Sequence, residues 1–346
     1  MKKWHILAAL IVLVTFVTAP VYADELKGMV FGKVPYTMAH AYHQAHVKHG
    51  VAHAKEKYGI KVMVIDGEST TDGTLAGVET FISQGVDGVM VHCNDPVVMD
   101  QIAKMGQNEN IPITSFFSET KSKIAPHLRI NEAVTSKQMG EAAAKKWKEW
   151  YPDKPIKIGV IDYLQFEIVQ TGRTGPFIAG VKAVDPSAEV VSKLEGDGNI
   201  EKAMTQMQDM IQAHPEINIV YGASADHALG AIAALEAAGR GIAKDGKCLT
   251  EIVVGTDATE AELIKVFDPN SSFKITQGLQ PAVNGAAEVD LMVKIKKGEI
   301  QMTEFFIMDT YNKFISYWDT SLEEAQKFLS YQYFSDVDLK QKVQGK

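Results

Sequence analysis

The sequence predicts an α/β protein made of two lobes, each built on a doubly wound parallel sheet. Between Gly28 and Gly255, short β-branched runs alternate with amphipathic stretches of helical period, and this alternation is typical of a parallel sheet with helices on both faces. The alternation comes in two blocks, because the stretch from Lys121 to Asn131 interrupts it. The length of 346 residues also favours two domains over one.

Each expected strand is a short run rich in β-branched residues, and each expected helix has apolar residues at helical spacing. In the first block we expect strands at 29–34, 61–66, 88–92 and 113–117, with helices at 41–58, 71–84 and 96–107. In the second block we expect strands at 156–161, 189–194, 217–221 and 252–255, with helices at 136–150, 173–184, 201–213 and 227–238. A further helix at 281–297, strands at 305–309 and 314–318, and a last helix at 322–331 follow, before a polar and frayed end at 342–346.

The first 23 residues are typical of a secretory signal peptide. Lys2 and Lys3 precede a mostly apolar run at 5–17, and Val21 and Ala23 occupy the minus-three and minus-one positions of a cleavage site. The apolar run is too short to span a membrane. We therefore expect residues 1–23 to be removed and the mature chain to work in the periplasm.

The mature chain is expected to begin at Asp24 without a membrane anchor, because Asp24 stands where a lipoprotein would need a cysteine. The formal net charge of −8 argues against nucleic acid or an anionic lipid surface as a partner. The two cysteines, Cys93 and Cys248, are expected in different lobes. We interpret them as two small buried apolar residues that form no disulfide.

No catalytic signature is found in the chain, so we expect neither an enzyme nor a bound cofactor. The stretch Gly241–Lys247 has the glycine and lysine spacing of a phosphate-binding loop. Cys248 follows it where such a loop needs Ser or Thr, and the stretch follows a helix and precedes a strand, the reverse of the required order.

Five histidines lie close together at the start of the first expected helix, and they could suggest a metal site. Steps of three residues rotate by about 60° around a helix, so these side chains spiral instead of converging, and we expect no metal. The five are His40, His43, His46, His49 and His53. His40 and His43, at the helix start, are expected to face a cleft, and the others to face solvent.

Three segments carry a resemblance to a known family. Gly77–Pro96 combines a helix, a glycine turn, a strand and a new helix start, and Gln206–Gly239 and Val253–Asp257 look like the matching parts of a second lobe. In this order the segments resemble the type I periplasmic solute-binding proteins of sugar ABC transporters, such as the ribose and xylose binders. The likeness extends from about Gly28 to Asp309.

The resemblance implies a receptor with two lobes joined by three crossovers, near Ile130, Gly278 and Glu304. The N-terminal lobe would comprise 24–130 and 279–304, and the C-terminal lobe 131–278 and 305–346. Such a receptor, acting as a monomer, would close on a small polyhydroxylated ligand and deliver it to the permease of an ABC importer. The alternative is a sensor of the same fold that docks on a membrane histidine kinase or chemoreceptor.

The resemblance also implies a ligand site where the two lobes face each other, beyond the carboxyl ends of the strands. From the first lobe we expect His40, Tyr42, His43, Phe117 and Ser118. Phe117 and Ser118 stand where the family usually has an Asp-Arg pair, so a small polyol, a modified sugar or a less polar ligand would suit the site better than a standard pyranose.

From the second lobe the resemblance implies seven contacts: Phe166, Thr171, Arg173, Ser224, Asp226, Asp257 and Gln277. Gln280 could take the place of Gln277. Asp257 and Asp226 could also cap helices, Arg173 could pair with a neighbouring acid, and Phe117 and Phe166 could lie in the core.

Overall fold

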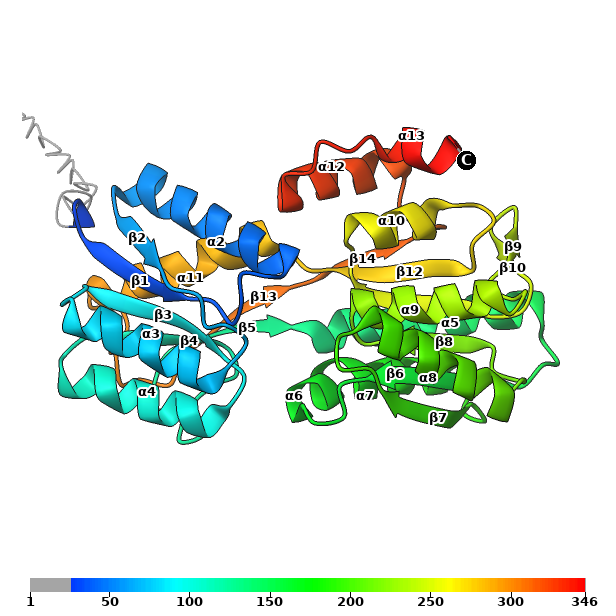
Figure 1. The fold of residues 1–346 in the computed structure, drawn as a ribbon, viewed down its shortest axis with the longest axis horizontal. Coiled ribbons are helices and arrows are strands. Elements are labelled where there is room, and N and C mark those ends of the chain that lie inside the picture. Colours follow the sequence, from blue (N-terminus) through cyan, green and yellow to red (C-terminus); the bar gives the residue numbers. More distant parts are fainter. Residues whose placement is uncertain (1–25, 346) are drawn as a thin grey trace, which may run out of the picture.

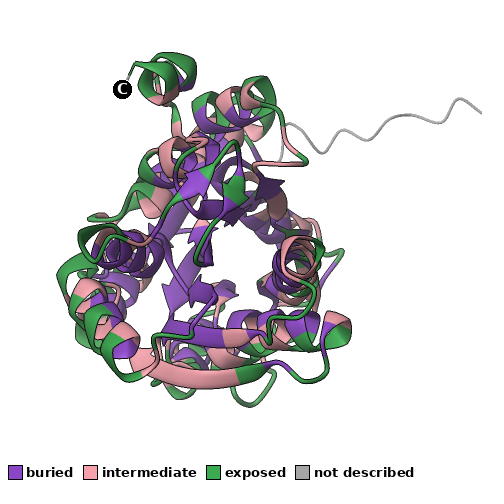
Figure 2. Ribbon diagram, turned by 90° about the vertical axis from the view of Figure 1, so that its right-hand side faces the viewer, coloured by how far each residue is buried: buried purple, intermediate pink, exposed green. Residues whose placement is uncertain are grey.

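A computed structural model describes residues 26–345 of the chain, so the expected signal peptide at 1–23 lies outside the described residues. Two six-stranded sheets lie side by side, each flanked by helices, with the three connecting segments between them (Figure 1). Figure 2 shows that the strands are largely buried and that the helices carry the exposed surface. The predicted α/β architecture of two lobes is confirmed.

The sheet of the first lobe has the strand order β13-β5-β4-β3-β1-β2, with all neighbours parallel. Its strands are β1 (Val30–Val34), β2 (Lys61–Val64), β3 (Gly88–Cys93), β4 (Ile113–Phe117), β5 (His127–Asn131) and β13 (Ile307–Tyr311). The helices are α2 (Ala41–His53), continued by the π-helical turn η1 (Ala54–Tyr58), then α3 (Thr71–Ser83), α4 (Pro96–Asn108) and α11 (Pro281–Lys296). Helices α2 and α11 cover one face and α3 and α4 the other (Figure 1).

The sheet of the second lobe has the order β14-β12-β11-β8-β6-β7. Its strands are β6 (Lys157–Asp162), β7 (Glu189–Glu195), β8 (Ile219–Gly222), β11 (Ile252–Asp257), β12 (Phe273–Gly278) and β14 (Lys313–Ser316). Its helices are α5 (Glu132–Trp150), α6 (Glu167–Val169), η2 (Gln170–Thr174), α7 (Gly175–Val184), α8 (Ile200–Ala213), α9 (Ala225–Ala237), α10 (Glu260–Phe267), α12 (Leu322–Tyr333) and α13 (Leu339–Gln344). The edge strand β14 is antiparallel to β12, which is an exception to the expected parallel sheet.

The chain passes between the two sheets at three places: from β5 to α5, from β12 to α11, and from β13 to β14. We expected the third passage near Glu304 and residues 305–346 in the second lobe. Instead β13 pairs with β5 from Ile307 to Tyr311, so the chain leaves the first sheet only after Tyr311. The third passage lies later than expected because residues 127–131, which we did not predict as a strand, form β5, and β13 pairs with the free edge of β5.

Several elements besides β5 were not predicted from the sequence. Strand β12 and helix α13 were not expected, and α13 lies where we predicted a frayed end. The stretch with the spacing of a phosphate loop forms an antiparallel hairpin of β9 (Ala243–Lys244) and β10 (Lys247–Cys248). The hairpin turns at Asp245 and Gly246, both of which have positive φ, so the glycine spacing serves the turn.

Each sheet is packed on both faces by buried apolar side chains. In the second lobe, Phe177 of α7 stacks on Tyr221 of β8 with ring centroids 4.3 Å apart. Cys93 and Cys248 are both buried and free, which confirms that they form no disulfide with each other. Within residues 26–345, every helix is too short or too polar to cross a membrane.

Candidate functional site

Polar loops follow the strands, and several of them provide the capping residue of the next helix. Asp95 caps α4 by accepting hydrogen bonds from the backbone N–H groups of Val97 and Val98. Ser224 caps α9 in the same way, and Thr259 caps α10 with a capping box. Because the carboxyl ends of parallel strands meet at one edge, these loops gather on the cleft side of each lobe.

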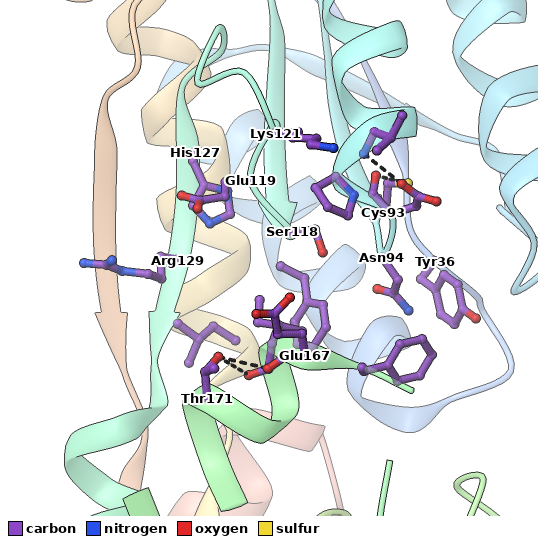
Figure 3. A pocket seen from close by; sticks show the side chains of 18 of the residues that line it. Tyr36, Cys93, Asn94, Ser118, Glu119, Lys121, His127, Arg129, Glu167 and Thr171 are labelled. Atoms are coloured by element: carbon purple, nitrogen blue, oxygen red, sulfur yellow. Dashed lines mark hydrogen bonds between the residues drawn. The ribbon is translucent and has the colours of Figure 1, made fainter. Parts of the chain in front are cut away.

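A cleft of about 1140 Å³ opens between the lobes. In the first lobe its walls come from the loops after β2, β3 and β4 and from β5, and in the second lobe from the start of α5 and from the loop and short helix α6 after β6. Figure 3 shows Ser118 and Asn94 on the first-lobe side of the cleft and Thr171 and Glu167 on α6 and η2 opposite them. The cleft therefore draws on both lobes.

Four of the predicted ligand residues line this cleft: Phe117, Ser118, Phe166 and Thr171. Phe117 ends β4 with a φ of 70°, a conformation that costs free energy for a residue other than glycine. The Thr171 hydroxyl donates to the backbone oxygen of Glu167 at 2.9 Å. These residues give the cleft a mixture of aromatic faces and hydroxyl groups.

Sequence reasoning missed several lining residues, among them Tyr36, Asn94 and Glu132. Tyr36 and Asn94 follow β1 and β3 directly, so the rule that ligands bind beyond strand ends could have found them. Glu132 begins α5 at the first crossover, directly after β5, which was not predicted as a strand. Glu132 could be predicted as a site residue only if β5, the strand that leads into the first crossover, were recognised in the sequence.

His92, near the end of β3, and His43, on α2, form an aromatic cluster in the first lobe. Neither is among the residues that line the cleft, although His43 was expected there. Their rings lie 4.9 Å apart, and the His92 ring is also 5.2 Å from that of Phe117. Burial lowers the pKa of His43 to about 3 and holds the pKa of His92 well below its ordinary value. Both imidazoles are therefore neutral at physiological pH, and each has a buried Nδ1 without a hydrogen-bond partner in the structure.

Arg173 lies buried in η2 behind the cleft and pairs with the neighbouring acid Glu132. Its Nε donates to Glu132 Oε2 at 2.7 Å, and its Nη1 donates to the backbone oxygen of Ala223 at 2.9 Å. Burial acts to lower the pKa of Arg173, but the carboxylates of Glu132 and Asp257 outweigh it and raise the pKa. Glu132 thus fixes the position of the Arg173 guanidinium, whose charge lowers the pKa of Asp257.

Asp257 ends β11, and it does not cap α10, because Thr259 does so. Its Oδ2 accepts a hydrogen bond from the backbone N–H of Ala225, the first residue of α9, at 3.0 Å. Burial raises the pKa of Asp257 to about 6, against the opposing effect of Arg173. The carboxylate thus lies at the start of a helix, where a negative charge is favoured.

Asp226 is half-buried in the first turn of α9, and burial raises the pKa of its carboxyl group. Ser224, not Asp226, is the capping residue of α9. His40, exposed at the start of α2 in the first lobe, lowers the pKa of both Asp226 and Asp257 through its charge. The expected contacts His40, Ser224 and Asp226 are not among the residues that line the cleft.

Two predicted contacts are turned away from the cleft. The hydroxyl of Tyr42 accepts a hydrogen bond from Asn284 Nδ2 at 2.9 Å, and its ring packs against the core of the first lobe. Gln277 is fully buried and its Oε1 accepts from the hydroxyl of Ser136 at 3.3 Å. Alternation along β12 directs the Gln277 side chain under α5, so it does not reach the cleft wall as expected.

The histidines of α2 have separate partners. His46 is buried against Glu288 at 3.3 Å, and His53 contacts Asp290 at 2.6 Å. His46 is thus buried, whereas we expected it to face solvent. No group of three or more His, Cys, Asp or Glu side chains in the described part of the chain is placed to hold a metal ion.

Known proteins resemble this chain along most of its length. The family model described as periplasmic binding protein domain matches residues 31–300. The ribose import binding protein RbsB of Escherichia coli (strain K12) is 25% identical over 302 residues, which cover 86% of this chain and 94% of the relative. The galactofuranose-binding protein YtfQ of the same organism is 25% identical over 285 residues, covering 79% of this chain and 83% of the relative.

Among solved structures, one from Mycobacterium smegmatis in complex with β-D-fucofuranose superposes with a TM-score of 0.72 at 18% identity, covering 91% of this chain and 98% of that one. At these identities the structural likeness supports the fold alone. The relatives named above are binding proteins and not enzymes, which agrees with our expectation for this chain. Because the family model matches well over half of its length, the chain belongs to the periplasmic binding protein family.

Proposed function

We propose that this protein is a periplasmic receptor that closes on a small polyhydroxylated ligand and delivers it to an ABC importer. The observation that carries the proposal is the cleft of about 1140 Å³, which takes its walls from both lobes. A ligand that contacts both walls binds the closed form better than the open one and shifts the population toward closure. The closed form, as a monomer, is then what the permease recognises.

The composition of the site supports a neutral polyhydroxylated ligand. Aromatic faces such as Phe117 can stack on the apolar side of a sugar ring, while Ser118, Asn94 and Thr171 offer hydrogen-bonding groups. Asp257 and Asp226 do not line the cleft in this structure, and we propose that closure of the lobes brings these acceptors to the hydroxyl groups of the ligand. Arg173 is paired with Glu132, and among the basic residues that line the cleft, Lys123 is paired with Glu119 and Arg129 with Asp309. Much of the positive charge at the site is therefore already balanced, which favours a neutral ligand over an anionic one.

The names of the relatives support a sugar over other solutes and an importer over a sensor. They include ribose import binding proteins and a galactofuranose-binding protein. Similar solved structures hold β-D-fucofuranose, myo-inositol or D-allose. We therefore propose that the ligand is a monosaccharide or a cyclic polyol.

A thermal-shift screen tests this proposal. The panel contains D-ribose, D-allose, L-arabinose, D-galactose and myo-inositol, with citrate as an anionic control. A ligand present at 100 times its Kd stabilises the folded state by about 2.7 kcal/mol, which gives a clear rise in Tm. We expect at least one neutral compound to raise Tm, citrate to leave it unchanged, and mass spectrometry to recover the bound compound unaltered. A panel without any rise in Tm, or a bound sugar that is chemically changed, would contradict the proposal.

A further inference from the structure

The C-terminal segment, residues 321–345, is anchored in the second lobe. Helix α12 begins with a capping box between Ser321 and Glu324. Its buried face, Phe328 and Leu329, joins the core of the second lobe together with Leu339 of α13. Figure 1 shows α12 reaching from the second lobe toward α2, after which the chain turns back to α13.

The end of α12 contacts the first lobe. The ring of Phe334 stacks on His49 of α2 with centroids 4.1 Å apart, and Lys48 Nζ lies 3.6 Å from the centre of the same ring. His49 Nε2 is 3.0 Å from the backbone oxygen of Tyr331. The side-chain oxygen of Gln332 accepts a hydrogen bond from the N–H of Ala282, in the first turn of α11, at 3.0 Å. The C-terminal segment is thus held by both lobes.

Tyr333, between these first-lobe contacts, turns toward the second lobe. Its hydroxyl donates to the backbone oxygen of Asp257 at 2.7 Å. Two residues further on, the Ser335 hydroxyl donates to Glu260 Oε2 at 3.3 Å. The C-terminal segment therefore bonds to the turn that joins β11 to α10.

This turn has an unfavourable backbone conformation. Asp257 has a φ of 107° and Ala258 a φ of 52°, both in the region that favours glycine. Such conformations are unfavourable for residues other than glycine and persist only where the surroundings enforce them. The side chain of Asp257 accepts a hydrogen bond from the backbone N–H of Ala225 in α9, and its backbone oxygen accepts one from the Tyr333 hydroxyl. The Tyr333 hydroxyl is thus one of the groups that hold the backbone of Asp257 in this conformation, and the backbone conformation sets the direction of the Asp257 carboxylate.

We propose that Tyr333 is a positioning residue for the Asp257 carboxylate, and that the C-terminal segment serves ligand binding by holding the turn after β11 in its strained form. The proposal rests on the proposed function, because it assigns the carboxylate to the ligand site. It gives a role to a part of the chain that lies beyond the match to the family model, which ends at residue 300. Ionisable groups face Asp257 from six elements or loops: Arg173, His40, Glu132, Glu262, Tyr163 and Tyr333.

The test compares Tyr333→Phe with Tyr331→Phe. Tyr333→Phe keeps the ring, which packs against the second-lobe core, and removes only the donor to Asp257. Tyr331→Phe is the matched control, because Tyr331 lies on the same helix, is 64% exposed, and contacts His49 through its backbone oxygen. Two quantities are measured: the pKa of the Asp257 carboxyl by carbon-detected NMR without ligand, and the Kd for D-ribose and for myo-inositol.

Loss of the hydrogen bond should let the turn relax and water reach the carboxyl group. We expect the pKa of Asp257 in Tyr333→Phe to fall from about 6 toward its ordinary value of 3.8, by about half a unit or more. The affinity for whichever of the two probes binds should fall about fivefold, as for one lost neutral hydrogen bond. Tyr331→Phe should change neither quantity.

An unchanged Asp257 pKa in Tyr333→Phe, or an equal change in Tyr331→Phe, would overturn the proposal. The NMR measurement needs no ligand, so it decides the role of Tyr333 even when neither probe binds the wild-type protein. Failure of both probes together with the whole sugar panel would instead count against the proposed function.

Discussion

Among single residues, Asp257 is the one on which the proposed site depends most. Its carboxylate is buried beside Arg173 and at the start of α9, and burial raises its pKa to about 6. At neutral pH the group is therefore ionised in surroundings that disfavour the charge. Hydroxyl donors from a ligand would replace the water that burial removes, so binding would relieve this cost.

Asp257→Asn should stabilise the ligand-free protein and weaken ligand binding. The fold raises the pKa of this acid, so the stability linked to its protonated form is present below about pH 4 and is lost as the pH rises through 6. Asn resembles the neutral form, and at pH 7.5 the variant should gain up to about 3 kcal/mol in free energy of unfolding. Urea denaturation at pH 7.5 and pH 4.5 measures the gain, which should shrink at the lower pH.

For the compound that binds the wild-type protein, the Kd of Asp257→Asn should rise about tenfold or more, as for a lost hydrogen bond to a charged group. A variant that is less stable at pH 7.5 and binds normally would show that Asp257 has a structural role only.

Arg173→Met should destabilise the protein strongly, because it leaves Glu132 buried without its partner. Breaking a buried ion pair on one side costs about 3–5 kcal/mol. The double variant Arg173→Met/Glu132→Gln should recover part of the loss, which denaturant unfolding measures as a coupling energy. Lys145→Met, which breaks the exposed pair between Lys145 and Glu141, is the control and should cost less than about 1 kcal/mol. Equal losses in the two single variants would refute the buried pairing.

The resemblance led us to expect both Ser118 and Asp257 at the cleft. Ser118 follows the buried strand β4 and lines the cleft, whereas Asp257 ends β11 and is not among the lining residues. The partner of Arg173 could not be predicted, because Glu132 lies 41 residues away in the chain. The direction of the Gln277 side chain could not be predicted either, because β12, the strand that contains Gln277, was not recognised in the sequence.

At the scale of elements, polar residues inside strands explain the missed strands. Strand β12 contains Lys274 and Gln277, both fully buried. Lys274 Nζ donates to backbone oxygens at the end of α10, those of Val266 and Asp268. These partners come from other elements, so the sequence around Lys274 does not read as the apolar run typical of a parallel strand. Strands such as β3 and β8, whose residues are all buried and mostly apolar, were predicted within two residues.

Helices α5 and α7 pack through two glycines, and this contact should tolerate no larger residue. A Cβ atom at Gly140 would lie 2.1 Å from the backbone oxygen of Phe177, and one at Gly180 would lie 2.1 Å from that of Lys137. Gly140→Ala should therefore lower the free energy of unfolding by about 3 kcal/mol, although alanine favours helices. Chemical denaturation provides the measurement, with Gln138→Ala on the exposed face of α5 as a control that should change stability by less than about 0.5 kcal/mol. A neutral Gly140→Ala would contradict this close packing.

At the scale of the whole molecule, the two lobes are joined by three passages of the chain and by the C-terminal segment. The passages permit rotation of one lobe against the other, as expected for a hinge that absorbs its motion at the ends of elements. The C-terminal segment adds side-chain contacts to both lobes, at His49 in the first and at Asp257 in the second. The two-lobed architecture was predictable from the repeated strand-helix pattern, whereas the bridging role of α12 was not, because its partners are far apart in the sequence.

The proposed function requires that the two lobes close on an unmodified small solute. Small-angle X-ray scattering on the protein, with and without a saturating concentration of the compound that raises Tm most, is the decisive measurement of this closure. We predict a smaller radius of gyration and a shorter maximum dimension in the presence of that compound. Identical scattering curves at full saturation, confirmed by calorimetry on the same samples, would contradict the account.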